Sequence, residues 1–337
     1  MMTYDEFREH VRDHIFEFLP EYENLEVNVN TFYKNNDYKR DGLCIRNDES
    51  ISPVIYLDKL YDKYDEEKDL NKAMMDIADI YREHAKSVGD RSEIVNTILN
   101  NPEEAKGRIF SKIVNTEANK ELLSNRPHKN VEDLSLVYQV LTSHTGDGIE
   151  SIAVTYDMAE KMGMSLDDLD TYAMENNSKL FPMKFVGMSE ILMGFMDPEM
   201  SEDLGIGQED EMMYILTNEP GVFGATYMSL PEALAEVAEK IDDDLVILPS
   251  SIHEVIILPV SQTAAMDMQS EEGLYELKEM VSQINGDVVS PEDILSNNVY
   301  RYDAKEHKLS LATPEIEHEQ VKTQQVEKNI RRPAMAH

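Results

Sequence analysis

Two apolar runs separated by a short polar corner dominate the hydrophobic pattern of the C-terminal half of the chain. The runs cover residues 245–248 and 255–260, and the corner covers residues 249–254. Both runs consist mainly of Val, Ile and Leu, which suit buried strands, whereas Pro and Ser in the corner are typical turn residues. The pattern therefore predicts a central hairpin over residues 244–261.

The N-terminal part combines helical and strand patterns. Thr3 and Glu6 have the spacing of a capping box, which predicts a helix that ends at Pro20. Apolar and polar residues alternate over residues 25–33, as in a half-exposed strand. Further along, the pattern predicts strands at residues 42–46 and 53–57 and two separate helices at residues 69–88 and 93–99.

The rest of the chain continues in the same way. Strands are predicted at the end of the segment 105–114 and at residues 134–141, 149–156, 212–217, 224–228, 299–302 and 308–311. Helices are predicted at residues 157–162, 165–176, 233–241 and 270–284, and a short one beginning at residue 290.

A recurring order of elements gives the fold class. At residues 54–58, 154–157 and 225–229, a strand that ends near a Tyr runs into a capped helix. We expect an α+β fold with an antiparallel or mixed sheet, built from strand–strand–helix units with helices packed on it.

Three segments are expected along the chain. Residues 1–311 form a compact body, which can divide into two lobes at about residues 1–125 and 126–311. Residues 187–211 are an acidic, Met-rich insertion, and residues 312–337 form a polar tail expected to be disordered.

The charge balance changes the range of expected partners. With 31 Lys and Arg against 67 Asp and Glu, the net charge is -36. This excess of acid argues against direct nucleic-acid binding and against an anionic membrane surface, because both need clustered Lys and Arg. We expect a cytoplasmic protein, since no apolar run is long enough to span a membrane and the N-terminus does not resemble a signal peptide.

The corner at residues 249–254 carries the best candidate site. Ser251, His253 and Glu254 are the residue types of a nucleophile, a base and an orienting acid. Adjacent residues of a regular strand point to opposite faces, so His253 and Glu254 cannot both face Ser251. The alternatives are a ligand site formed by Ser250, Ser251 and His253, or a corner whose side chains only satisfy the turn.

No motif indicates a metal or a cofactor. The chain lacks His-Glu-x-x-His, Gly-x-Ser-x-Gly and the dinucleotide glycine fingerprint. Its one cysteine, Cys44, excludes a disulfide framework within the chain and a metal site made of several cysteines. A second, smaller candidate is the basic spot at residues 126–129, including His128, which can receive an anionic ligand or can be a solvated turn.

Several short segments resemble an uncharacterised bacterial family, a domain of unknown function in low-GC gut anaerobes, often near mobile elements. They are residues 2–7, 52–57, 125–128, 213–218, 223–225, 248–255 and 299–303. The most specific is Pro-Ser-Ser-Ile-His-Glu at residues 249–254, and the insertion and the tail depart from the family pattern. The resemblance implies a compact bacterial domain and no particular activity.

These observations favour a non-enzymatic protein that binds a protein partner or a small ligand inside a bacterial cell, in the context of a mobile element or a conflict with phage. One alternative is a hydrolase or transferase that uses Ser250, Ser251, His253 and Glu254. Another is an acidic protein that imitates DNA and inhibits a nucleic-acid-binding protein.

Overall fold

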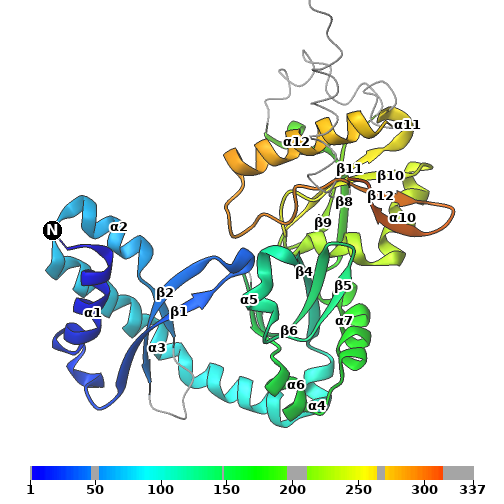
Figure 1. Cartoon of the computed structure of the whole chain (residues 1–337). Coiled ribbons are helices and arrows are strands. Elements are labelled where there is room, and N and C mark those ends of the chain that lie inside the picture. The colour runs from blue at the N-terminus through cyan, green and yellow to red at the C-terminus, as the bar shows by residue number, and fades with distance from the viewer. Residues whose placement is uncertain (1, 47–52, 146–147, 196–210, 264–269, 314–337) are drawn as a thin grey trace, which may run out of the picture.

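A computed structural model describes residues 2–46, 53–145, 148–195, 211–263 and 270–313. Helices and antiparallel strands alternate along this part of the chain, so the α+β prediction is confirmed. The described strands form three separate sheets with helices packed on them (Figure 1).

The first sheet belongs to an N-terminal lobe, residues 2–85. The elements of the lobe are α1 (Tyr4–Phe18), η1 (Pro20–Tyr22), β1 (Glu26–Tyr33), η2 (Asn35–Asp37), β2 (Lys39–Arg46), β3 (Val54–Tyr56), α2 (Asp58–Glu67) and the first half of α3 (Leu70–Asn100). The strands pair antiparallel in the order β1-β2-β3, and α1 and α3 bury their apolar faces in a common core. The capping box at the start of α1 is confirmed, because Thr3 and Glu6 exchange side-chain and backbone hydrogen bonds.

The prediction of two helices between residues 69 and 99 is wrong. One continuous helix, α3, leads from the N-terminal lobe to the second sheet (Figure 1). Gly89 lies inside it, and a glycine costs a helix only about 1 kcal/mol. The helix tolerates this cost because each end is packed, with Ile77 in the N-terminal core and Ile98 against the second sheet.

The second sheet, which we call the middle sheet, confirms the strands predicted in this region. Its strands are β4 (Ile109–Asn115), β5 (His128–Val131), β6 (Leu134–Thr145) and β7 (Gly148–Ala153), and β6 pairs with each of the others. The surrounding helices are α4 (Pro102–Lys106), η3 (Glu117–Asn119), α5 (Lys120–Leu123), α6 (Tyr156–Met162) and α7 (Leu166–Leu180). Asn177 of α7 bonds to Ser111 on one face of β4, so the neighbouring Phe110 and Lys112 point to the opposite face.

The third sheet contains the predicted central hairpin. Its order is β13-β12-β10-β11-β9-β8, and its strands are β8 (Met183–Gly187), β9 (Tyr214–Asn218), β10 (Leu245–Leu248), β11 (Val255–Pro259), β12 (Tyr300–Asp303) and β13 (Lys308–Leu311). Its helices are α8 (Met188–Phe195), η4 (Gly224–Ser229), α10 (Pro231–Ile241), α11 (Val260–Thr263) and α12 (Glu271–Val288). Alternate residues of β10 pack in the core with α10 and in the core with α12, so the hairpin is buried on both faces.

Two local predictions in this region are wrong. Residues 224–228 were expected to form a strand, but they form the buried 3-10 helix η4, and β9 pairs instead with β8 and β11. The third strand–strand–helix unit is therefore absent. Residues 290–293 were expected to begin a helix, but they form a turn that docks on other parts of the chain.

Two predicted segments lie largely outside the described residues. Of the insertion at 187–211, the structure describes Gly187 at the end of β8, helix α8 and Glu211; of the tail, it describes residues 312 and 313. The division into two lobes near residue 125 stays a prediction. No helix in the described part of the chain is long and apolar enough to cross a membrane.

Candidate functional site

The corner between β10 and β11 is a docked segment and not a free turn. Ser251 forms an isolated β-bridge with Ile294, and the backbone of Ile252 donates to Asp293. Two further backbone hydrogen bonds run from residues 295 and 296 to the carbonyls of Ser250 and Pro249. The loop at residues 290–296 therefore holds the corner along its length.

The hydroxyl of Ser251 serves the local turn. Its Oγ accepts the backbone N–H of His253 at 2.9 Å, and Ser251 is buried. Ser250 is half-buried, and Glu254 has no side-chain hydrogen bond or ion pair with any described residue. The structure thus brings Ser251 to the backbone of His253, while the carboxylate near the imidazole belongs to a residue other than Glu254.

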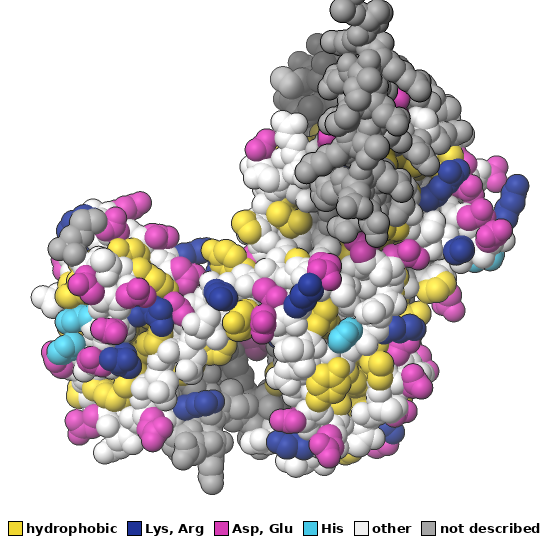
Figure 2. Space-filling model, viewed as in Figure 1, with side chains coloured by type: hydrophobic (Ala, Val, Ile, Leu, Met, Phe, Trp, Pro, Cys, Tyr) yellow, Lys and Arg dark blue, Asp and Glu magenta, His cyan; other side chains and the backbone are white. Residues whose placement is uncertain are grey.

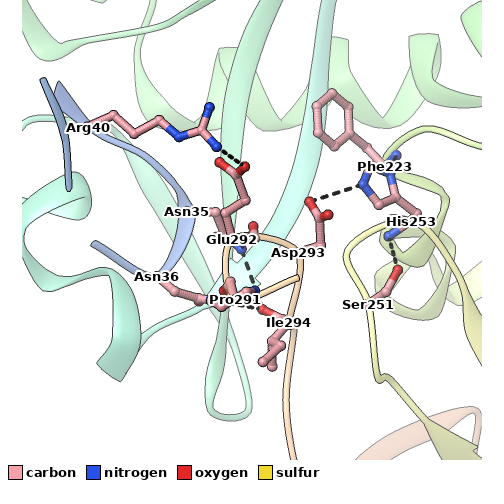
Figure 3. A network of polar contacts seen from close by, with 10 residues as sticks. All are labelled: Asn35, Asn36, Arg40, Phe223, Ser251, His253, Pro291, Glu292, Asp293 and Ile294. Carbon is pink, nitrogen blue, oxygen red and sulfur yellow. Dashed lines mark hydrogen bonds and ion pairs between the residues drawn. The ribbon is translucent and has the colours of Figure 1, made fainter. Parts of the chain in front are cut away.

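Both ring nitrogens of His253 have partners. Nδ1 accepts the backbone N–H of Phe223 at 3.3 Å, so the neutral ring carries its proton on Nε2. Nε2 faces Oδ1 of Asp293, also at 3.3 Å. The imidazole therefore connects the segment that begins η4 to the 290–296 loop, and Figure 3 shows it between Phe223 and Asp293.

Phe223 adopts a backbone conformation that is unusual for an aromatic residue. Its φ is 59°, in the left-handed region, where a bulky side chain is strained. The hydrogen bond to His253 holds this conformation, and the ring stacks on His253 with centroids 5.9 Å apart. It also lies 6.4 Å from the ring of Phe110 on β4. Strain at an aromatic side chain that remains half-buried is typical of a functional position.

Gly224 makes the conformation of Phe223 possible. A Cβ atom at this position would lie 2.3 Å from Oγ1 of Thr217 and 2.5 Å from the carbonyl oxygen of His253. Only a glycine allows this segment to approach β9 and the corner so closely. The segment that carries Phe223 is therefore fixed by sterics as well as by hydrogen bonding.

A lysine lies over the ring of Phe223. Nζ of Lys112, on β4, is 4.9 Å from the centroid of the Phe223 ring, within the range of a cation–π contact. Burial, followed by the positive charges of Arg126 and Lys34, lowers the pKa of Lys112 to about 8. No described acidic side chain forms an ion pair with Lys112.

Three cations from different elements gather near this ring, and we call Lys34, Lys112 and Arg126 the basic cluster. Lys34 follows β1 at the tip of the first hairpin, where its Nζ lies 4.5 Å from the centroid of the Tyr56 ring. Arg126 precedes β5, and burial lowers its pKa. All three are half-buried.

The tip of the β1–β2 hairpin contacts the loop at residues 290–296 through a polar network (Figure 3). Arg40 of β2 pairs with Glu292 at 2.7 Å, and the Asn36 side chain donates to the carbonyls of Pro291 and Ile294. The Glu292 side chain points toward Arg40, and that of Asp293 points toward His253. The loop at residues 290–296 thus joins the N-terminal lobe to the corner.

The chain was compared with known protein families, curated proteins and solved structures. The model of a family of unknown function, DUF5688, matches residues 4–304. The chain belongs to this family. No curated protein and no solved structure gives a significant match. The expected membership in a family of unknown function is confirmed, and the matched range includes the corner, Phe223 and the basic cluster.

Several residues of the site in this DUF5688 member could not be found from the sequence. Gly224 was expected in a strand and Phe223 directly before it, and the contact between His253 and Asp293 joins positions 40 residues apart. The basic spot at residues 126–129 was a usable signal, since Arg126 belongs to the basic cluster. Lys112 and Lys34 lie in separate elements that only the fold brings together.

The arrangement is suited to binding more than to proton transfer. The Ser251 hydroxyl contacts a backbone amide, and both imidazole nitrogens of His253 hold other segments in place. In the described part of the chain, no three His, Cys, Asp or Glu side chains are grouped as a metal site requires. By contrast, the half-buried ring of Phe223 and the basic cluster form no hydrogen bond or ion pair of this kind through their side chains with the described residues.

Proposed function

We propose that this protein is a binding protein whose ligand contacts Phe223 and the basic cluster beside it. The observation that carries the proposal is the left-handed backbone of Phe223, which His253 and Gly224 hold in place. Strain of this kind costs about 1–3 kcal/mol and persists where the surrounding structure enforces it. Here it presents an aromatic ring next to a lysine that has no acidic partner among the described residues.

The ligand must approach from the Lys112 side of the ring. On the other side, the space lined by Phe110, Asn177 and Phe223 has a volume of only about 10 Å³. This volume holds about one water molecule at most. Contact with any larger ligand therefore requires the side of the Phe223 ring over which Nζ of Lys112 lies.

The corner supports this site and does not supply its chemistry. His253 and Ser251 act as structural hydrogen-bonding groups, so a hydrolase or transferase based on Ser250, Ser251, His253 and Glu254 gains no support from the geometry. DNA mimicry gains none either, since acidic and basic side chains are intermixed over the face seen in Figure 2. We further propose that this binding protein acts in a bacterial cytoplasm, a location that is supported by the resemblance of its short segments to a bacterial family often found near mobile elements.

Replacement of Phe223 tests the proposal. Phe223→Gly removes the ring but keeps a residue that adopts a φ of 59° without strain. Tagged wild-type and variant proteins are incubated with a bacterial extract, and the captured proteins and small molecules are identified by mass spectrometry. We expect at least one species to be retained by the wild type and reduced about tenfold or more on Phe223→Gly.

A matched control is Met280→Ala, which removes an exposed apolar side chain from α12, a helix packed on the opposite face of the third sheet from η4. This variant should retain the same species as the wild type. Thermal unfolding of all three proteins verifies that each is folded. An identical set of captured species on all three would contradict the proposed function.

A further inference from the structure

The basic cluster is unusual in a chain of this charge. Acidic residues outnumber Lys and Arg by 67 to 31, and many basic side chains of the described part pair with a carboxylate. Lys34, Lys112 and Arg126 form no ion pair with any described residue. Solubility does not require such a group, because exposed lysines at the surface are enough for it.

The register of the middle sheet places part of the cluster in one row. Lys112 on β4 and His128 on β5 both lie opposite Val137 of the intervening strand β6. Residues directly opposite one another point to the same face of the sheet. Strands that are two apart in a sheet lie about 10 Å from each other, so this is the approximate separation of Lys112 and His128. Arg126 is two residues before His128, and its carbonyl is hydrogen-bonded to Nδ1 of His128.

The third cation, Lys34, belongs to the N-terminal lobe. The segment η2, which follows Lys34, contacts β4, η3 and α5 (Figure 1). Asn36 and Asp37 in this segment both have a positive φ, and the Asp37 carboxylate accepts the backbone N–H groups of Glu121 and Leu122. Lys34 is therefore held near Lys112 by a tip that is fixed at several points.

The same face offers a further donor. Gln139 lies opposite Phe110, and it is 5% exposed. Its Nε2 has no hydrogen-bond acceptor in the described structure, although its Oε1 accepts the hydroxyl of Ser151. A buried donor without an acceptor is unfavourable unless a ligand or water supplies one.

These groups have a common complement. Cations that are partly desolvated and close to one another destabilise the protein, and a bound anion offsets both the desolvation and the repulsion. We propose that the basic cluster binds a small molecule through a phosphate or carboxylate group, next to the ring of Phe223. This inference rests on the proposed function and names the chemical class of its ligand.

The ligand is a small anion and not a nucleic acid. The net charge of -36 repels an extended polyanion along most of its length, because the cluster covers only a short part of the surface. A small anion is affected mainly by charges within about 8 Å at physiological salt. The charges that act most strongly on Lys112 are the other two members of the cluster, Arg126 and Lys34.

Direct binding measurements test the inference. Isothermal titration of the full chain with pyrophosphate, and separately with citrate, distinguishes a phosphate ligand from a carboxylate ligand. We expect the wild type to bind one of the two probes, and Lys112→Met to weaken that binding by about tenfold or more, as expected when a charged contact is lost. Lys112→Arg keeps the charge and should stay within about threefold of the wild type.

Lys240→Met is the matched control, because Lys240 is exposed on α10 and pairs with Glu236. It should bind like the wild type. Absence of binding to both probes, or equal binding by Lys112→Met and the wild type, would overturn the inference. If either result occurs while Phe223→Gly still loses a captured species, the binding function stands and its ligand is not an anion. If Phe223→Gly captures the same species as the wild type and Lys112→Met binds the probes equally well, both proposals fail.

Discussion

At the scale of single residues, the site depends on backbone conformations that side-chain patterns do not reveal. Residues 224–228 were predicted to form a strand, yet they form a 3-10 helix, in which Gly224 lies against the carbonyl of His253, and Phe223 before it is left-handed. The close approach of Gly224 to Thr217 is a tertiary contact, and it has no counterpart in local propensity. This is why the hairpin over residues 244–261 was predicted correctly and the segment beside it was not.

Gly224→Ala should destabilise the protein strongly. The new Cβ atom would overlap Oγ1 of Thr217 and the carbonyl oxygen of His253, and the backbone atom cannot move away without shifting the corner. We expect a loss of about 2 kcal/mol or more in the free energy of unfolding, measured by urea denaturation.

The control is Gly107→Ala, because nothing lies within 4 Å of a Cβ atom at Gly107 and its φ is negative. That substitution should change stability by less than about 1 kcal/mol. Equal effects of the two substitutions would mean that the approach of Gly224 to the corner is not a tight one.

At the scale of elements, two short segments connect parts of the molecule that are distant in sequence. The tip of the β1–β2 hairpin and the loop at residues 290–296 meet in the network of Figure 3, and that loop also holds the corner. The hydrophobic pattern predicted the strands of the β1–β2 hairpin and the hairpin over residues 244–261. It assigned residues 290–293 to a helix. A Ser-Pro-Glu-Asp sequence suits a helix start as well as a turn, and only the docking partners decide between them.

Substitution of Asn36 separates the side-chain and backbone contributions at the hairpin tip. Its side chain donates to the carbonyls of Pro291 and Ile294, and its φ is 60°. Asn36→Gly should reduce the free energy of unfolding by about 1–2 kcal/mol through the lost hydrogen bonds. Asn36→Ala should cost about 1 kcal/mol more, because alanine is strained in the left-handed region.

Urea denaturation of the two variants and the wild type measures both contributions. If Asn36→Ala and Asn36→Gly were equally stable, the left-handed conformation would not contribute to docking. If neither differed from the wild type, the tip would not hold the N-terminal lobe to the loop at residues 290–296.

At the scale of the whole molecule, the sequence predicts the α+β class, the central hairpin and most elements, because these follow from local periodicity. It does not predict the basic cluster, whose members come from the first hairpin, β4 and the turn before β5. The composition predicts an acidic surface, with a net charge of -36, and gives no indication of three cations without acidic partners in the described structure. The fold therefore creates a local reversal of charge that only the three-dimensional arrangement reveals.

The central claim is that Lys112 is present for binding at the expense of stability. Its pKa falls from 10.5 to about 8 on folding, so the folded protein binds its proton less tightly than the unfolded chain does. The contribution of Lys112 is therefore unfavourable below about pH 8, and stability rises with pH between about 8 and 10.5 on account of this group. The other charged or titratable groups near Lys112 are Arg126, Lys34, His128 and His253.

The most direct test compares the free energy of unfolding of the wild type and Lys112→Met, by urea denaturation, with and without pyrophosphate or citrate. Without ligand at pH 7, the variant should be more stable by about 1–3 kcal/mol, and this difference should shrink as the pH approaches 10. The probe that binds should stabilise the wild type and leave the variant unchanged. A variant that is less stable than the wild type at pH 7, or that gains as much from the probe, would contradict the account.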